Sequence, residues 1–452
     1  MTGILWNFVS FIVALGVLVA VHEFGHFWVA RKCGVKVIRF SIGFGKSLWK
    51  RTAKDGTEYT LSLIPLGGYV KMLDGRVEDV PDSLRSQAFD QQGLGKRAAI
   101  VAAGPIFNFL FAIVAYWAVF MMGIPAVKPV VGSVEPSSIV AQAGLQPNMQ
   151  IMSVSGVDTP DWETVNMELV AHIGDSSMTM TVATPDSIGS SEKLNIDLTT
   201  WNFDPEKESA IKALGFTPYT PEIKTAIAQV TEDGAAMKAG LAAGDEIIRL
   251  NDQPVDKWQA LVDTIKQSAN IPLTLTVLRN GEEQQFTLIP DAKTLKSGKV
   301  IGFAGIAPQV GNWPDGYRFE MQYGPVESIG KAIDKTGQLI SLTASMLKKL
   351  VVGDVGLNNL SGPISIAKGA GTTAEYGLVY FLGFMALISV NLGIINLVPM
   401  PMLDGGHLMF FAIEAVIRRP VPEKVQEMGY RIGGAIIFSL MAIAIFNDFT
   451  RL

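Results

Sequence analysis

The stretch HEFGH, residues 22–26, lies inside an apolar run that extends over residues 4–30. A run of that length can cross the roughly 30 Å hydrocarbon core of a membrane as a helix. Residues four apart share one face of a helix, so His22 and His26 can bind the same metal ion while Glu23 lies beside it as a general base. The alternative is a polar patch that only stabilises helix packing. Because an unpaired Glu is costly in hydrocarbon, we favour a zinc site within a membrane helix.

The composition indicates a membrane protein with a sizeable polar portion. Of the 452 residues, 48% are apolar and only 17% are charged, whereas about 25% of the residues in a soluble domain are charged. The first apolar run is too long, and too polar at its end, for a cleaved secretory signal, so we expect it to be retained. The runs expected to span the membrane are Ile4–Ala30, Ala98–Pro125, Gly377–Leu403 and the shorter Ile432–Asn447.

The distribution of charge predicts how these spans are oriented. Residues 123–376 carry 19 Lys and Arg against 29 Asp and Glu, whereas the remainder carries 18 basic and 13 acidic residues. Basic residues gather just after the first run and just before the last, and the positive-inside rule places both loops in the cytoplasm. The N-terminus and the long acidic insert then lie outside, with residues 22–26 toward the cytoplasmic side. The one cysteine, Cys33, excludes a disulfide within the chain.

Residues 35–72 are too polar to cross a membrane and predict short β segments with turn glycines. The segments are residues 41–45, 59–64 and 65–70, and alternating residues before a Pro and a Gly pair suit a hairpin with an exposed edge. Within a bilayer an open edge is tolerated only where it lines a protein cavity. A plain cytoplasmic hairpin is the alternative, but the position directly after the HEFGH helix favours the cavity.

The acidic insert contains a sequence repeat. Residues 134–151 recur 96 residues later as residues 230–247. The pattern of a strand, a small-residue turn, Gly-Leu and a second strand resembles PDZ domains, which commonly capture an extended peptide at a sheet edge. The first copy departs from the pattern, because Met149 stands where the second copy has Asp245. A role as a spacer or sieve is the alternative to peptide capture.

Apolar residues at helical spacing continue between residues 323 and 371, with lysines on the other faces. Such a segment can lie on the outer membrane surface. The alternative is a helix packed on the second PDZ-like domain.

A zinc site needs a third protein ligand, and few acids or histidines accompany the other apolar runs. Residues 396–407, NLVPMPMLDGGH, end the third run at the same expected depth as His26. The two prolines release backbone groups there, and the Gly pair permits close approach of another helix. Spacing alone leaves both Asp404 and His407 as candidates.

The HExxH motif, the NxxPxPxLDG motif of residues 396–405 and the twin PDZ-like insert together resemble the site-2 protease family, most nearly its bacterial regulators of sigma-E protease. The resemblance covers nearly the whole chain. It implies one Zn²⁺ ion held by His22, His26 and Asp404, with Glu23 as the catalytic base and His407 not a ligand. It also implies that the substrate is held by Asn391, Asn396, Gly67, Gly68 and Tyr69. For Asn391 an interhelical hydrogen bond is the alternative.

These observations predict a polytopic α-helical membrane protein with four transmembrane helices, a membrane-associated β-hairpin region and two PDZ-like α+β domains inserted on the periplasmic side. The expected parts are transmembrane helix 1 with HExxH (residues 1–30), a cytoplasmic or re-entrant β region (31–96), transmembrane helix 2 (97–125), the first (126–215) and second (222–310) PDZ-like domains, an amphipathic linker at the membrane surface (320–375), transmembrane helix 3 with NxxPxPxLDG (377–404) and transmembrane helix 4 (430–450).

The resemblance implies a zinc metalloendopeptidase of the bacterial inner membrane. Its expected substrates are pre-trimmed single-span membrane proteins, of the anti-sigma factor type or remnant signal peptides, cleaved within the transmembrane segment to release a cytoplasmic fragment. Other expected partners are membrane lipid and periplasmic peptides or proteins at the PDZ-like domains, and no nucleic acid. A metal transporter and an inactive scaffold are the rival interpretations. Glu23 argues against a transporter, since an ion path needs no base beside a ligand, and the intact ligands argue against a scaffold.

Overall fold

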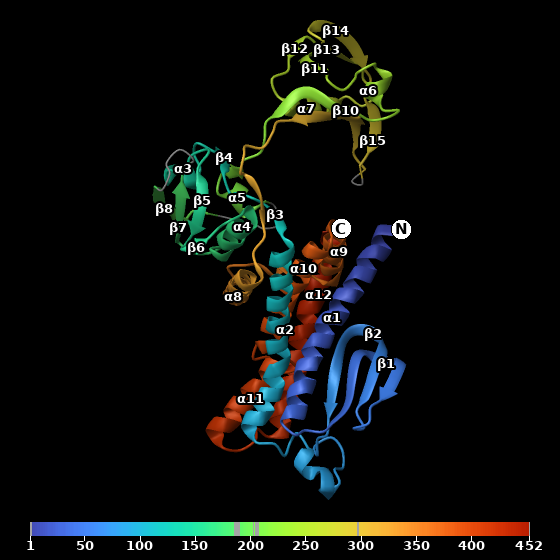
Figure 1. Cartoon of the computed structure of the whole chain (residues 1–452), viewed down its shortest axis with the longest axis vertical. Helices are drawn as coiled ribbons and strands as arrows, with labels where there is room; N and C mark the ends of the chain where they lie inside the picture. The colour runs from blue at the N-terminus through green and yellow to red at the C-terminus, as the bar shows by residue number, and fades with distance from the viewer. Residues whose placement is uncertain (1, 185–189, 202, 204–207, 296–297, 452) are drawn as a thin grey trace.

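Four long helices form the centre of the computed structural model, which describes residues 2–184, 190–201, 203, 208–295 and 298–451. They are α1 (Thr2–Lys32), α2 (Leu94–Met122), α10 (Leu378–Leu397) and α12 (Glu423–Thr450). Within the described residues, these four are long and apolar enough to cross a membrane. Helix α2 lies against both α1 and α10 (Figure 1).

The third and fourth spans differ from their expected bounds. The third was expected to continue to Leu403, but α10 ends at Leu397 and a separate helix, α11 (Asp404–Ile417), follows. Pro399 and Pro401 explain the break, because proline lacks the N–H group that a helix interior needs. The fourth was expected from Ile432, but α12 begins at Glu423. Charged residues in its first turns hid this start from a hydropathy pattern.

The expected β hairpin lies beside α1, at the end of the helices away from the chain termini (Figure 1). Strands β1 (Val37–Thr52) and β2 (Glu58–Met72) are longer than predicted, and each folds back on itself. Ser41 pairs with both Thr60 and Tyr69, so the first half of β1 lies between the two halves of β2. In the described chain, residues 68–72 are therefore paired on one side only and form an open edge.

Two units of similar architecture follow α2, at the end of the helix bundle where both termini lie (Figure 1). The first inserted unit, residues 131–218, contains β4 (Val131–Val134), α3 (Ile139–Gln142), β5 (Gln150–Val154), β6 (Val157–Asp158), α4 (Trp162–Ala171), β7 (Ser177–Ala183), β8 (Ser191–Asp197), α5 (Ala210–Ala213) and β9 (Phe216–Pro218). The second, residues 223–310, contains β10 (Ile223–Val230), α6 (Ala235–Lys238), β11 (Glu246–Leu250), β12 (Gln253–Pro254), α7 (Trp258–Gln267), β13 (Leu273–Arg279), β14 (Glu282–Leu288), β15 (Asp291–Thr294), β16 (Val300–Phe303) and β17 (Ile306–Val310).

Corresponding elements of the two units keep a constant separation along the chain. Helices α3 and α6 begin at Ile139 and Ala235, and α4 and α7 begin at Trp162 and Trp258, the same distance apart. The main sheets have the orders β6-β5-β7-β8 and β14-β13-β11-β10-β17. Each unit has its own buried apolar core. Strands β3 (Ile124–Val127) and β18 (Arg318–Met321) pair and close the insert at its base.

The difference between the two sequence copies has a structural counterpart. The side chain of Asp245 is 1% exposed, and its carboxylate accepts hydrogen bonds of 2.6 and 2.7 Å from Arg279. At the corresponding positions the first unit has Met149, which is buried in its core, and Ala183. An ion pair in one unit is thus replaced by two apolar residues in the other, so neither unit leaves an unpaired buried charge at these two positions.

Helix α8 (Pro325–Val352) belongs to the segment that was expected to lie on the membrane surface or to pack on the second inserted unit. It lies against α2, α10 and the first inserted unit, so the expected alternative of packing on the second unit is wrong. The buried ammonium group of Lys349 donates to the backbone oxygens of Ala171 and Ile173 and to the carboxylate of Asp175. These acceptors follow the end of α4, where a cation is favoured.

The remaining elements tie α12 to the rest of the bundle. They are the 3₁₀ helices η1 (Asp82–Gln87) and η2 (Leu357–Asn359), and α9 (Pro363–Tyr376). The carboxylate of Asp448, near the end of α12, accepts hydrogen bonds from the backbone N–H groups of Gly362, Ile364 and Ser365 at the start of α9. A helix N-terminus favours such a negative group.

Candidate active site

Three side chains from distant parts of the sequence meet between α1 and α11. The Oδ2 atom of Asp404 lies 3.2 Å from Nε2 of His22 and 3.5 Å from Nε2 of His26, and the two Nε2 atoms are 3.2 Å apart. Ligand bonds of about 2.0–2.1 Å in a tetrahedral site separate the ligand atoms by about 3.3 Å, so this triangle fits one zinc ion. The buried Oδ2 atom of Asp404 receives no hydrogen bond from the described residues, and a cation at this position would satisfy it.

Helix α2 orients both imidazole rings. Nδ1 of His26 lies 2.9 Å from the backbone oxygen of Ile100, and Nδ1 of His22 lies 3.0 Å from the amide group of Asn108. A histidine that binds a metal through Nε2 carries its proton on Nδ1 and donates it to such an acceptor. The amide oxygen of Asn108 is buried and has no hydrogen-bond partner among the residues that the structure describes. Rotating this amide by half a turn places the oxygen opposite Nδ1 of His22, which satisfies both groups.

Two glycines allow the helices to approach at this site. A Cβ atom at Gly104 of α2 would lie 2.3 Å from Nε2 of His26 and 2.7 Å from Cε1 of His22. A Cβ atom at Gly25 of α1 would lie 2.5 Å from the backbone oxygen of Ala103. Any side chain at Gly104 would therefore displace the imidazole rings. The sequence reasoning missed Gly104 and Asn108, although a Gly and an Asn one helical turn apart in an apolar run were a detectable signal.

The segment between α10 and α11 places Asp404 at the beginning of a helix. Met402, just before it, has a φ angle of 85°, a strained value for a residue with a side chain. A Cβ atom at Gly405 would lie 2.3 Å from the backbone oxygen of Leu397, so the Gly pair lets the segment fold tightly. Gly433 of α12 packs as closely against Pro401. The segment is thus held between three helices, and the N-terminus of α11 favours the Asp404 carboxylate.

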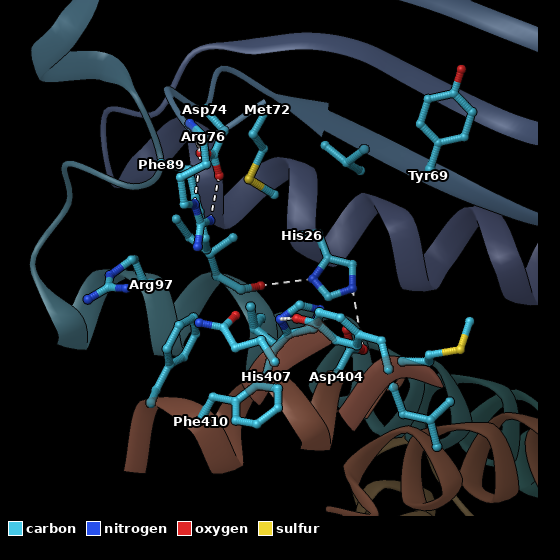
Figure 2. Close-up of a pocket in the computed structure, with 18 of the residues that line it drawn as sticks. His26, Tyr69, Met72, Asp74, Arg76, Phe89, Arg97, Asp404, His407 and Phe410 are labelled. Atoms are coloured by element: carbon cyan, nitrogen blue, oxygen red, sulfur yellow. Dashed lines mark hydrogen bonds and ion pairs between the residues drawn. The ribbon is translucent and has the colours of Figure 1, made fainter. Parts of the chain in front are cut away.

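A cavity of about 1120 Å³ opens at these residues. Figure 2 shows His26, Asp404 and His407 converging on it from two helices, with Tyr69 on the nearby β strand. The sequence-predicted residues that line it are His22, Glu23, His26, Gly68, Tyr69, Asn396, Asp404 and His407. Gly67 and Asn391 are not among the lining residues.

The open edge of β2 lies directly beside Glu23. A Cβ atom at Gly68 would be 2.9 Å from Cγ of Glu23 and 2.7 Å from the backbone oxygen of Ser41, so only glycine lets the strand approach α1 this closely. Tyr69 next to it stacks on Phe44, with ring centroids 6.2 Å apart. The cavity therefore combines the three candidate ligands, a carboxylate and an unpaired strand edge.

The two asparagines predicted to hold the substrate occupy different surroundings. Asn396 lines the cavity, whereas the side chain of Asn391 accepts a 2.8 Å hydrogen bond from the hydroxyl group of Thr343 on α8. This bond between α8 and α10 matches the alternative interpretation of Asn391 better than direct substrate contact.

Comparison with known proteins identifies the family. The model of peptidase family M50 matches residues 10–440. A Vibrio cholerae chain whose name describes a zinc metalloprotease is 69% identical over 452 residues, which is 100% of both chains. Protease RseP of Yersinia pestis is 55% identical over 452 residues, and the regulator of sigma-E protease RseP of Escherichia coli is 54% identical over 454 residues, each covering 100% of both chains. The chain therefore belongs to peptidase family M50, the site-2 protease family of zinc metalloproteases, as the HExxH and NxxPxPxLDG motifs indicated.

Proposed function

We propose that this protein is an intramembrane zinc endopeptidase of the bacterial inner membrane. Its substrate is the transmembrane segment of a single-span protein already trimmed on the outer side, of the anti-sigma factor type or a remnant signal peptide. Cleavage releases a cytoplasmic fragment. The observation that carries the proposal is the common cavity, which brings His22, His26 and Asp404 together with Glu23 and an open strand edge.

We assign His22, His26 and Asp404 as the ligands of one Zn²⁺ ion and Glu23 as the catalytic base. When bound, zinc supplies Lewis acidity that polarises the scissile carbonyl and lowers the pKa of a water molecule. Glu23 accepts a proton from the attacking water and delivers it to the leaving amine nitrogen. Asp404, which also lies beside the two histidines, is assigned as a ligand, and this leaves Glu23 as the base.

Substrate binding must compensate for helical hydrogen bonds that are lost when the segment unwinds. The edge formed by residues 68–72 can pair with the extended substrate, because its outward N–H and C=O groups have no partner strand. Gly67 provides the bend that leads into this edge, and Gly68 and Tyr69 belong to it. The Asn396 amide is available for the remaining backbone groups of the substrate. Asn391 acts in this scheme by fixing α8 on α10.

The charge distribution supports the orientation. The basic loops face the cytoplasm, so the active site lies toward that side, and the N-terminus and both inserted units are periplasmic. We assign the units as PDZ-like domains, within residues 126–215 and 222–310, that contact periplasmic peptides and exclude untrimmed substrates. The four spans, the β region of residues 31–96 and the amphipathic linker of residues 320–375 complete the domain organisation.

The test combines metal analysis with cleavage of single-span substrates by the purified full-length protein. We expect about one zinc ion per wild-type chain and cleavage within the transmembrane segment. Glu23→Gln should keep the zinc and abolish cleavage, because it removes only the proton acceptor. Zinc loss in that variant would place Glu23 among the ligands. Zinc transport into vesicles without cleavage would identify a transporter instead.

A further inference from the structure

His407 lines the cavity but has no part in the mechanism above. It lies one helical turn after Asp404 on α11, at a spacing that puts both side chains on one face. Tyr430 of α12 lies across from it. The imidazole Nδ1 atom is 3.4 Å from the Tyr430 hydroxyl oxygen, and the two ring centroids are 5.7 Å apart. Tyr430 is in turn held by the edge-to-face contact with Phe410.

This pair determines which nitrogen of His407 carries a proton. Burial lowers the pKa of His407, an effect that the Asp404 carboxylate opposes, and the lower pKa favours the neutral imidazole. The Tyr430 hydroxyl group and Nδ1 are within hydrogen-bond distance, and a hydroxyl group that donates to Nδ1 leaves the proton of a neutral imidazole on Nε2. In the described part of the chain, Nε2 of His407 has no hydrogen-bond partner. In this tautomer His407 presents an N–H donor to the cavity that it lines.

The two arginines that line the cavity are already engaged. Arg76 is paired with Asp74, and Arg97 is paired with Glu414. Hydrolysis of a peptide bond moves negative charge onto the former carbonyl oxygen, and a fixed neutral donor aimed at that oxygen stabilises the transition state.

We propose that His407 is a further catalytic residue, oriented by Tyr430, whose Nε2–H group donates a hydrogen bond to the scissile carbonyl oxygen as its negative charge develops. This inference rests on the proposed function. The water oxygen bonds to the carbonyl carbon while the π electrons move to the oxygen, and Glu23 takes the water proton. The carbon–nitrogen bond then breaks and the amine receives that proton. His407 keeps its own proton throughout.

The test compares His407→Phe, His407→Gln and Tyr430→Phe in the full-length protein. Zinc content, melting temperature, kcat and KM are measured for each variant. The binding of two inhibitors is measured as well. One is a phosphinic peptide, whose tetrahedral phosphinate mimics the charged oxygen, and the other is a simple zinc-binding thiol. We expect His407→Phe to keep its zinc and lower kcat about 100–1,000-fold with KM little changed. Phosphinic peptide binding should weaken by a similar factor, while thiol binding is unchanged.

Because glutamine retains an N–H donor, His407→Gln should recover part of the lost kcat. Tyr430→Phe should lower kcat less than His407→Phe does, since it removes only the group that orients the ring. Loss of zinc in His407→Phe, or an unchanged kcat with zinc intact, would overturn the proposal. A lower melting temperature with unchanged kcat would show that His407 only joins α11 to α12. If the wild type shows no cleavage that depends on Glu23, the proposed function itself fails.

Discussion

The amide group of Asn108 lies 3.0 Å from Nδ1 of His22, so the second long helix holds a proposed metal ligand carried by the first. Partners of this kind orient a ligating ring and raise its basicity. We therefore expect Asn108→Leu to weaken zinc binding by about 10–100-fold, which competition with a chelator will measure. Ser389→Ala is the matched control, because Ser389 donates to the backbone oxygen of Asn108 and not to the imidazole. Equal zinc affinity in Asn108→Leu and wild type would remove Asn108 from the site.

Gly104→Ala should disrupt the metal site by steric overlap alone. The added methyl group would lie 2.3 Å from Nε2 of His26, so the ring must move away from its ligand position. We expect zinc content to fall well below one ion per chain. Gly95→Ala on the same helix is the control, because a Cβ atom there meets nothing within 4 Å. A Gly104→Ala protein with full zinc content would show that α1 and α2 can separate at little cost.

The two asparagines of α10 should respond differently to substitution. Asn391→Ala and Thr343→Val should each loosen α8, and a double-mutant cycle of melting free energies should give a coupling of about 0.6 kcal/mol. Asn396→Ala should leave stability nearly unchanged and slow cleavage. Asn396→Ala should slow the cleavage of strongly helical substrates more than that of substrates with Gly or Pro near the cut, because more unwinding must be stabilised. An equal loss of cleavage rate for both substrate classes would show that Asn396 serves helix packing.

The open strand edge can be tested by cross-linking. In a Cys33→Ala background, Lys71→Cys places a thiol on the edge that lines the cavity. We expect a disulfide with cysteines placed in the unwound substrate segment, strongest at alternate substrate positions because successive strand residues face opposite sides. Leu48→Cys lies outside this edge and serves as the control. Equal cross-linking at Leu48→Cys and Lys71→Cys would refute strand pairing.

The Asp245–Arg279 pair should make the second inserted unit sensitive to acid. Burial raises the pKa of the Asp245 carboxyl, but hydrogen bonds from Arg279 and the Ala242 N–H group outweigh this effect and lower the pKa overall. The pair stabilises the unit fully above the unfolded-state pKa of about 3.9, and this contribution is lost as the pH falls through the lower folded-state pKa. Hydrogen exchange of the full-length protein, corrected for intrinsic rates, should show easier opening of β11 and β13 below about pH 4.

A double variant, Asp245→Met with Arg279→Ala, copies the first unit and should remove this acid sensitivity. Asp245→Met alone leaves the arginine without its carboxylate and should destabilise the unit by about 1.5–3 kcal/mol. An unchanged pH dependence in the double variant would show that another group causes it.

Long apolar runs and residue spacing were sufficient to predict the four helices, because hydrocarbon imposes a length and a composition on a span. They were insufficient at Pro399 and Pro401, where a new helix begins, and at the charged start of α12. Turn residues indicated three short β segments, whereas the structure has two long strands. The folding of β1 between two halves of β2 depends on pairing between distant residues. Periodicity carries no information about such pairing.

The two candidate histidine ligands could be found from a local pattern, since the HExxH spacing places two imidazoles on one face. Spacing left Asp404 and His407 both open, and only the family resemblance implied Asp404. The contributions of Asn108 and Gly104 could not be found in this way, because they depend on which face of α2 packs against α1. Asn391 illustrates the opposite case: the family resemblance implied contact with substrate, an interhelical hydrogen bond was the alternative, and only the position of α8 revealed Thr343 as a partner.

If His22, His26 and Asp404 are the zinc ligands, as proposed, they also determine when the enzyme can become active during its own synthesis. His22 and His26 are made and inserted first, whereas Asp404 is separated from them by both inserted units and by α10. At about 5–20 residues per second, a nascent chain carries the two histidines for tens of seconds before the carboxylate exists. During that time two imidazoles alone bind zinc weakly and no complete catalytic centre is present. A growing chain is therefore unable to cut neighbouring nascent membrane proteins until its C-terminal third has been inserted.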